Sequence, residues 1–150
     1  MKSRSEIAIK KFSEGYNCSQ SVLYAFCDYL SLDRDLALRM SCGFGAGMGR
    51  KQEVCGAITG GILVISTKFG RGDLDVRKST ELTYKKTRKL LDRFAEKHDT
   101  YLCRKLINGC ELQTDDGQKQ FKDKNLLNKV CKPCVESVIE ILENLMSKAV

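Results

Sequence analysis

Cysteines are the side chains of this 150-residue chain most able to do chemistry, and there are eight of them. The first residues carry charges and no apolar secretory segment, so we expect a reducing, cytoplasmic setting. In that setting, cysteines beyond the needs of packing more often serve metal or redox chemistry than disulfides. The cysteines are Cys18, Cys27, Cys42, Cys55, Cys103, Cys110, Cys131 and Cys134.

The elements that must position these thiols are predicted to be helices throughout. Apolar residues recur at helical spacing, and no strand-like alternation persists. The sequence predicts helices over about 3–14, 18–30, 33–40, 51–69, 73–97, 101–107, 114–127 and from about 133 onward. We therefore expect one all-α domain over residues 1–150, a bundle of about seven to eight helices.

Alternate predicted helices carry a cysteine at or near their first turn, where the helix dipole and free N–H groups favour a thiolate. Helices joined by short connections run roughly antiparallel, so alternate helices begin at the same end of a bundle. At least three of these sulfurs should then lie within about 8 Å of a common point. The predicted redox thiols and metal ligands are Cys18, Cys55, Cys103 and Cys131, with Cys110 or Cys134 as substitutes.

A glycine-rich stretch runs from Gly43 to Gly61. Glycine occupies every second position of its first part, which allows backbone N–H groups to turn inward around an anion, a thiolate or sulfide. The glycines expected to supply these groups are Gly45, Gly47 and Gly49. In the following helix, Gly56 and Gly60 share one face and would let another backbone approach closely. The alternative interpretation of the whole stretch is a flexible turn followed by a tightly packed helix.

Other site types find little support in the sequence. The single histidine, His98, sits near the polar end of a charged helix and is expected to be a solvated cation. No strand precedes the glycines and no Gly-Lys-Ser/Thr follows them, so no nucleotide is expected. The net charge of +7 is spread over most helices, which makes nucleic acid an unlikely partner. No apolar run is long enough to span a membrane.

The spacing of two cysteines adds a weaker signal. Cys131-Lys132-Pro133-Cys134 resembles the CxPC motif of thioredoxins, but no strand precedes it and no second pair supports a zinc ribbon. Pro133 suits a first helical turn, and it biases Lys132 away from helical angles. Cys27, inside an apolar stripe, is expected only to pack in the core.

Several linked motifs resemble those of the C_GCAxxG_C_C family of redox-active proteins. They are GYNCSQ at 15–20, GFGAGMGR at 43–50, CGAITG at 55–60, CRKL at 103–106, Gly109-Cys110 and Cys131. Cys18, Cys55 and Cys131 match the family pattern directly, and its third cysteine corresponds to Cys103 or Cys110, with Cys103 favoured. The resemblance implies a small prokaryotic helical protein related to the cysteine domain of split-Soret cytochromes. No C-x-x-C-H is present, so covalent haem is not implied.

Together these features predict an oxidoreductase or electron-transfer protein with one redox or metal centre. We expect first an iron–sulfur cluster, because all-thiolate ligation suits it, or another metal bound by thiolates. The second expectation is thiol–disulfide exchange without a metal. The partner would be an unidentified redox protein or molecule, and the close-packing glycines are compatible with a homodimer. The rival hypothesis is a non-enzymatic helical module with buried structural cysteines and a basic partner-binding surface.

Overall fold

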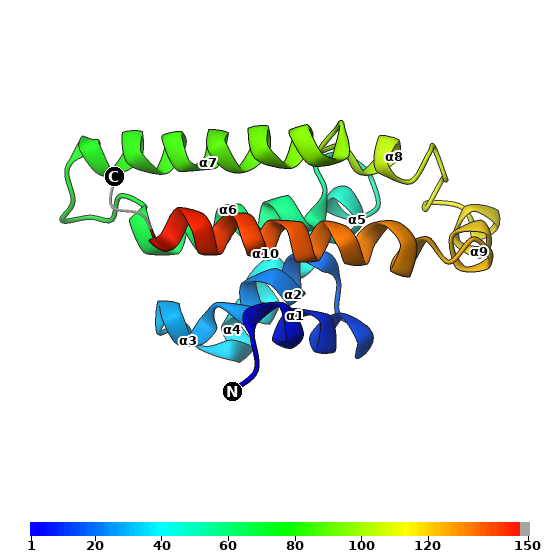
Figure 1. Cartoon of the computed structure of the whole chain (residues 1–150), viewed down its shortest axis with the longest axis horizontal. Helices are drawn as coiled ribbons and strands as arrows, with labels where there is room; N and C mark the ends of the chain where they lie inside the picture. Colours follow the sequence, from blue (N-terminus) through cyan, green and yellow to red (C-terminus); the bar gives the residue numbers. More distant parts are fainter. Residues whose placement is uncertain (148–150) are drawn as a thin grey trace.

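The structure is a computed structural model that describes residues 1–147, and these residues fold as a set of packed helices (Figure 1). In chain order the elements are α1 (Arg4–Ser13), α2 (Cys18–Ala25), α3 (Cys27–Leu30), α4 (Arg34–Ser41), η1 (Cys42–Phe44), α5 (Gly45–Met48), α6 (Gly56–Phe69), α7 (Arg77–His98), α8 (Cys103–Leu106), α9 (Asp115–Asp123), η2 (Leu127–Cys131) and α10 (Lys132–Ser147). Seven of them have seven or more residues, which confirms the all-α prediction. The predicted domain extends to residue 150, and its last three residues lie outside the described part.

Helix α6 lies at the centre of the fold. It packs against α2, α7 and α10, and α1 covers α2 and α10. Figure 1 shows α7 and α10 running side by side along the length of the molecule, with the shorter α1 to α4 below them. The core joins these helices through fully buried side chains of Phe26, Ile58, Ile65, Leu90, Phe94, Val138 and Leu142. None of the helices within residues 1–147 combines the length and the apolarity that a membrane crossing requires.

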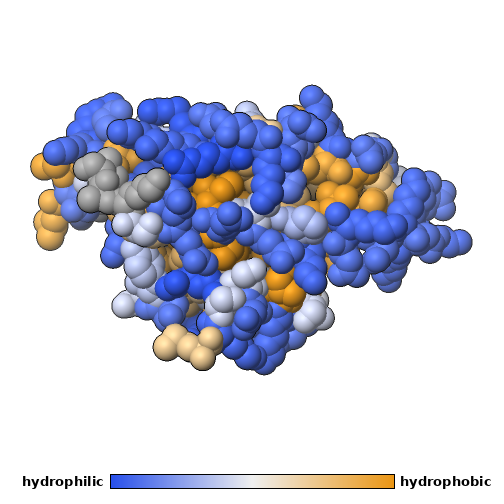
Figure 2. Space-filling view, viewed as in Figure 1, coloured by the Kyte–Doolittle hydropathy of each residue, from blue (hydrophilic) through white to orange (hydrophobic). Residues whose placement is uncertain are grey.

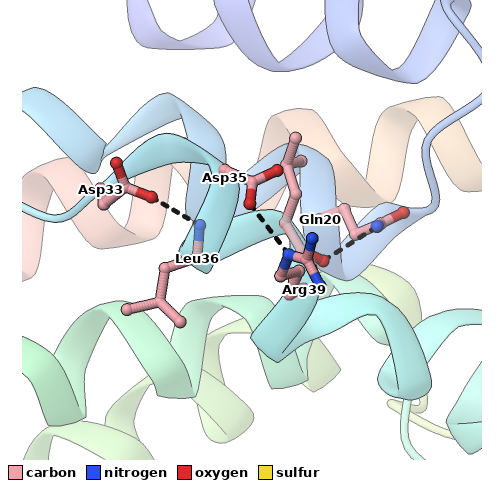
Figure 3. Close-up of polar contacts among 6 residues, drawn as sticks. Gln20, Asp33, Asp35, Leu36 and Arg39 are labelled. Carbon is pink, nitrogen blue, oxygen red and sulfur yellow. Dashed lines mark hydrogen bonds and ion pairs between the residues drawn. The ribbon is translucent and has the colours of Figure 1, made fainter.

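The start of α2 is held by a capping box. The Asn17 side chain accepts a hydrogen bond from the Gln20 N–H, and the Gln20 Oε1 accepts one from the Asn17 N–H. Gln20 also donates through Nε2 to the carbonyl of Leu38 on α4 (Figure 3). The box therefore fixes both where α2 begins and how α4 lies against it.

Helix α4 has its own local signals, also drawn in Figure 3. The Asp33 carboxylate accepts the Leu36 N–H at 2.8 Å and caps the helix. The Arg39 Nε donates to the Asp35 carboxylate one turn away at 2.9 Å. The Asp33 cap sets where the helix begins, whereas the exposed Asp35–Arg39 pair adds little to stability.

Several helices are shorter than the sequence predicts. The helix expected over 18–30 breaks at Phe26, whose φ and ψ are −107° and 4°, so that α2 and α3 are separate. Helix α7 begins at Arg77 instead of Asp73 because Gly72 and Asp75 form a hydrogen-bonded turn before it. Helix α9 ends at Asp123, before the expected end near 127. Apolar residues keep their helical spacing beyond each of these boundaries. The spacing therefore does not indicate where the helices begin or end.

The prediction for the residue before Pro133 was wrong. Lys132 has helical angles of −60° and −50°, and a π-helical turn, η2, continues directly into α10. Proline lacks an N–H donor, so the usual bond back to residue 129 cannot form. The wider π turn keeps the chain helical across this gap. As a result, Cys131 lies inside a continuous helical segment and not just before it.

His98, the last residue of α7, is less solvated than the sequence predicts. Earlier on the same helix, Thr83 is buried and its hydroxyl donates to the Ser79 carbonyl. His98 is half-buried, with its Nε2 at 2.9 Å from the Ser137 Oγ and its ring stacked near Phe94. Burial lowers the pKa of His98, so it is not the solvated cation that the sequence predicts.

The close approach predicted for the α6 glycines is present. A Cβ at Gly60 would lie 2.7 Å from the Ser19 carbonyl oxygen of α2, and one at Gly56 would lie 3.2 Å from the Cys18 Cβ. Both distances are shorter than ordinary van der Waals contact. The two missing side chains let α6 cross α2 nearly backbone to backbone, next to Cys18.

We expect Gly60→Ala to destabilise the fold by about 1–3 kcal/mol, because the added methyl group overpacks against backbone that cannot easily move. The helix-propensity gain of about 1 kcal/mol would work in the opposite direction. Urea unfolding followed by circular dichroism measures the difference. Gly43→Ala is the matched control, since nothing lies within 4 Å of a Cβ there. A Gly60→Ala protein as stable as the parent would show that the glycine has no packing role.

Candidate functional site

Five cysteines from different parts of the chain line one cavity of about 310 Å³. They come from the first residue of α2, the residue before α6, the first residue of α8, the last residue of η2 and the first turn of α10. Figure 1 shows the starts of α8 and α10 at the same end of the molecule, near α5. These five residues, Cys18, Cys55, Cys103, Cys131 and Cys134, are called the thiol cluster below.

The thiol cluster contains two side-chain pairs. Cys18 interacts with Cys131, and Cys55 interacts with Cys134. Cys103 lies close enough to Cys55 and Cys131 for charge on either to raise its pKa. Because each pair has one member from η2 or α10, this continuous helical segment connects the other helices at the site.

Cys55 is the thiol of the cluster best suited to ionise. Its pKa is lowered, first by the Cys134 thiol and then by the backbone N–H groups of Ala57 and Ile58, which outweigh the opposing effect of burial. These N–H groups belong to the free first turn of α6, for which Cys55 is the N-cap residue. The pKa of Cys134 is raised by its interaction with Cys55 and by burial. Within this pair, Cys55 is therefore the thiol that ionises first, and Cys134 is the one that keeps its proton longer.

The pKa values of two further thiols of the cluster, Cys18 and Cys103, are raised. The interaction with Cys131, followed by burial, raises the pKa of Cys18 well above the ordinary range. Burial, with smaller effects from Cys55 and Cys131, raises the pKa of Cys103 to about 12. The arrangement thus places one thiol of lowered pKa, Cys55, among three thiols of raised pKa.

A short backbone pairing holds Cys55 beside Cys103. The Cys55 N–H donates to the Tyr101 carbonyl at 2.8 Å, and the Cys103 N–H donates to the Glu53 carbonyl at 2.6 Å. Val54 forms an isolated antiparallel bridge with Leu102 between these bonds. Extended backbone here delays the start of α6 to Gly56, later than the predicted start at 51–53.

The remaining cysteines lie elsewhere. Cys110 is buried in the smaller hydrophobic cluster, to which Cys103 also belongs, but it does not line the cavity and donates its S–H to the Gly117 carbonyl at 3.0 Å. Cys27 packs in the main core, as expected, and Cys42 is exposed. Of the two substitutes named from the sequence, the structure brings Cys134 to the cavity and leaves Cys110 away from it. The C-x₂-C spacing with Cys131 was the signal for Cys134.

The glycine loop is wound in a left-handed turn, which the sequence did not reveal. Ala46, Gly47, Met48, Gly49 and Arg50 all have φ between 52° and 69°. The N–H of Gly49 bonds the Gly43 carbonyl within the loop, and that of Gly45 bonds the Cys42 carbonyl. Of the three glycines predicted to face a ligand, only Gly47 lines the cavity.

A buried glutamine fixes this loop to the site. Gln52, only 4% exposed, donates through Nε2 to the Cys110 carbonyl and accepts the Leu112 N–H through Oε1. Its own φ is 60°, a strained value for a side chain of this kind. The two bonds satisfy the buried amide and hold the loop against the 110–112 segment.

Two cations on the cavity wall were also missed by sequence reasoning. Arg50 is the last residue of the left-handed turn and Lys122 lies on α9, and both are exposed. No aspartate or glutamate is among the lining residues of this cavity. Their positions depend on the loop geometry and on how α9 folds over the site, so no motif in the sequence could identify them.

The cluster was also compared with the requirements of a metal centre. Five thiols with two nearby cations provide the donor type that iron–sulfur clusters use. Within residues 1–147, however, no three cysteine, histidine, aspartate or glutamate side chains are grouped as ligands of one metal ion. The donor chemistry of the thiols suits an iron–sulfur cluster, and four of the five thiols are arranged as two pairs.

The site geometry predicts that alkylation of Cys55 begins at a lower pH than alkylation of an ordinary cysteine. Because its pKa is lowered, the rate with iodoacetamide should reach half its plateau at a lower pH than that of a peptide of the same local sequence. Cys134→Ala removes the largest cause of this shift and should move the midpoint to higher pH. Mass spectrometry of the labelled peptides measures both, with Cys110→Ala as the control that leaves the midpoint in place. An unchanged midpoint in Cys134→Ala would contradict the pairing.

Comparison with known proteins agrees with the cysteine pattern. No curated protein and no solved structure matches the chain. A family model described as "Putative redox-active protein (C_GCAxxG_C_C)" matches residues 16–145, which include the whole thiol cluster. The chain therefore belongs to the C_GCAxxG_C_C family of redox-active proteins.

Proposed function

We propose that this protein is a thiol–disulfide oxidoreductase whose reacting pair is Cys55 and Cys134. The observation that carries the proposal is the pairing of a thiol whose pKa is lowered with one whose pKa is raised, both on the wall of a cavity. Thiol–disulfide exchange needs a thiolate to attack and a second thiol to resolve the mixed disulfide. The Cys55–Cys134 pair supplies both.

The reaction would proceed in two exchanges. The Cys55 thiolate attacks one sulfur of a substrate disulfide, forms a mixed disulfide and expels the other sulfur as a thiolate, which takes up a proton. Cys134 then loses its proton and attacks the Cys55 sulfur, releasing the second substrate thiolate. The protein pair ends as a disulfide and has passed two electrons to the substrate, and an external dithiol must reduce it for another turnover.

The neighbouring pair offers a means to relay electrons. Cys103 interacts with one member of each pair, because both Cys55 and Cys131 raise its pKa. Exchange from the Cys55–Cys134 disulfide to the Cys18–Cys131 pair would move the oxidation away from the substrate. The raised pKa of Cys18 makes this second pair the slower nucleophile.

Single-turnover reaction with dithiodipyridine tests the first proposal. A Cys42→Ser background removes the exposed thiol, and release of the thiopyridone product is followed by its absorbance. We expect a fast phase in this background that disappears in Cys55→Ser and persists in Cys110→Ser. A fast phase that survives Cys55→Ser would rule out Cys55 as the nucleophile.

An iron–sulfur centre is the second candidate, favoured by the number and type of donors around one cavity. Such a group would supply one-electron transfer when bound. Cys18, Cys55, Cys103 and Cys131 would hold it, with Cys134 as an alternative ligand. The two thiol pairs would have to separate for these residues to act as ligands.

Iron and acid-labile sulfide analysis after anaerobic purification separates the two candidates. For the iron–sulfur candidate we expect bound iron with absorbance above the protein band, lowered in Cys103→Ser and retained in Cys110→Ser. Colourless, metal-free protein under conditions that reconstitute other clusters would eliminate this candidate. The thiol–disulfide proposal would then stand alone.

A further inference from the structure

The thiols of the reacting pair are hidden from large partners. Cys55 is 6% exposed and Cys134 is 1% exposed, and both are reached through the cavity. A disulfide within a folded protein could not approach sulfurs at this depth without rearrangement. The approach is open to a small molecule that enters a cavity of about 310 Å³.

The wall of the cavity is mostly apolar. Side chains of Phe12, Leu106, Ile107, Phe121 and Val130 form much of it. Figure 2 shows hydrophobic surface open to solvent toward the end of the molecule where α8 and α9 lie. Such a wall favours the hydrocarbon part of a ligand and excludes water from the thiols.

The charged lining residues have one sign only. Arg50 and Lys122 are both cations, and no carboxylate lines the cavity. Neither side chain has an ion-pair partner among residues 1–147. Both are exposed while Cys55 and Cys134 are buried, so the cations lie at the rim and the sulfurs of the reacting pair lie deeper. The cavity therefore presents positive charge at its mouth and thiols inside.

The backbone around Arg50 supports a functional position for this side chain. Arg50 has a φ of 67° and ends the run of left-handed residues that begins at Ala46. Left-handed backbone is unfavourable for residues other than glycine, and such strain persists where the surrounding structure enforces it. Here Gln52 and the backbone bond from Glu53 N–H to the Gly47 carbonyl enforce it. Ala46, Gly47 and Arg50 all lie on the cavity wall as a result.

We propose that the cavity binds a low-molecular-weight disulfide that carries carboxylate groups. This inference rests on the proposed thiol–disulfide function. The carboxylates would pair with Arg50 and Lys122 at the rim, the hydrocarbon arms would lie on the apolar wall, and the disulfide would reach Cys55. The exchange follows the two steps described above: Cys55 bonds one substrate sulfur, the other leaves as a carboxylate-bearing thiol, and Cys134 releases the second.

A charge series of small aliphatic disulfides tests the substrate class. Dithiodipropionate is anionic, hydroxyethyl disulfide is neutral and cystamine is cationic, and the three are similar in size. Rates of Cys55 oxidation in the Cys42→Ser background are divided by the rates of the same disulfides with dithiothreitol, which removes their intrinsic differences. We expect the anion to react fastest and the cation slowest after this correction.

Variants assign the preference to the two rim cations. Arg50→Gln and Lys122→Gln should each reduce the preference for the anion by about three- to fivefold, as expected for partly exposed charge pairs. Lys51→Gln and Lys119→Gln are the matched controls, because both lysines are exposed neighbours that do not line this cavity. Equal corrected rates for all three disulfides, or equal effects of the control variants, would overturn the proposal.

A redox-inert ligand separates this inference from the reaction itself. Suberate has two methylene groups in place of the disulfide of dithiodipropionate, so it can bind but cannot react. We expect suberate to bind by calorimetry, with weaker binding to Arg50→Gln. If no disulfide oxidises Cys55, the proposed function fails even where suberate binds; if neutral disulfides react and suberate does not bind, only the substrate class fails.

Discussion

The crossing of α2 over α6 is the contact on which the site depends. Gly56 and Gly60 have no side chains to separate the two helices, and the Ser19 backbone of α2 fills the space. Glycine inside a helix costs about 1 kcal/mol each in propensity. That cost is offset by a packing contact that puts the start of α2, with Cys18, beside the start of α6, with Cys55.

The segment that runs from η2 into α10 completes the site. Cys131 and Cys134 are three residues apart on this segment, so both face the cavity, yet they pair with thiols from two different helices. The π turn before Pro133 keeps the segment helical through Cys131. A proline that ended the helix there would leave Cys131 on a loop, with less control over its position.

Local signals in the sequence were sufficient to predict much of the fold. Asn17 and Gln20, three residues apart, form a capping box, and Thr114 caps α9 by accepting the Gly117 N–H. The all-helical class and the close approach at Gly56 also followed from pattern and spacing. These features depend on residues three or four apart, for which sequence reasoning is strongest.

Features set by distant contacts were not predictable. The left-handed turn at Ala46–Arg50 is held by Gln52, whose partners are about 60 residues away at Cys110 and Leu112. The approach of Cys103 to Cys55 depends on the bridge between Val54 and Leu102, and the helical backbone at Cys131 depends on the π turn. Neither contact leaves a periodic or motif signal in the sequence.

Mapping of the disulfides formed on mild oxidation tests the central claim most directly. The protein is treated with a limiting amount of a small oxidant, the free thiols are alkylated, and linked peptides are identified by mass spectrometry. Our account predicts that Cys55–Cys134 forms first and Cys18–Cys131 second, while Cys27 and Cys110 remain free. Oxidation that produces no linkage within the thiol cluster, or that joins molecules only through Cys42, would contradict the claim that these five thiols act as one redox centre.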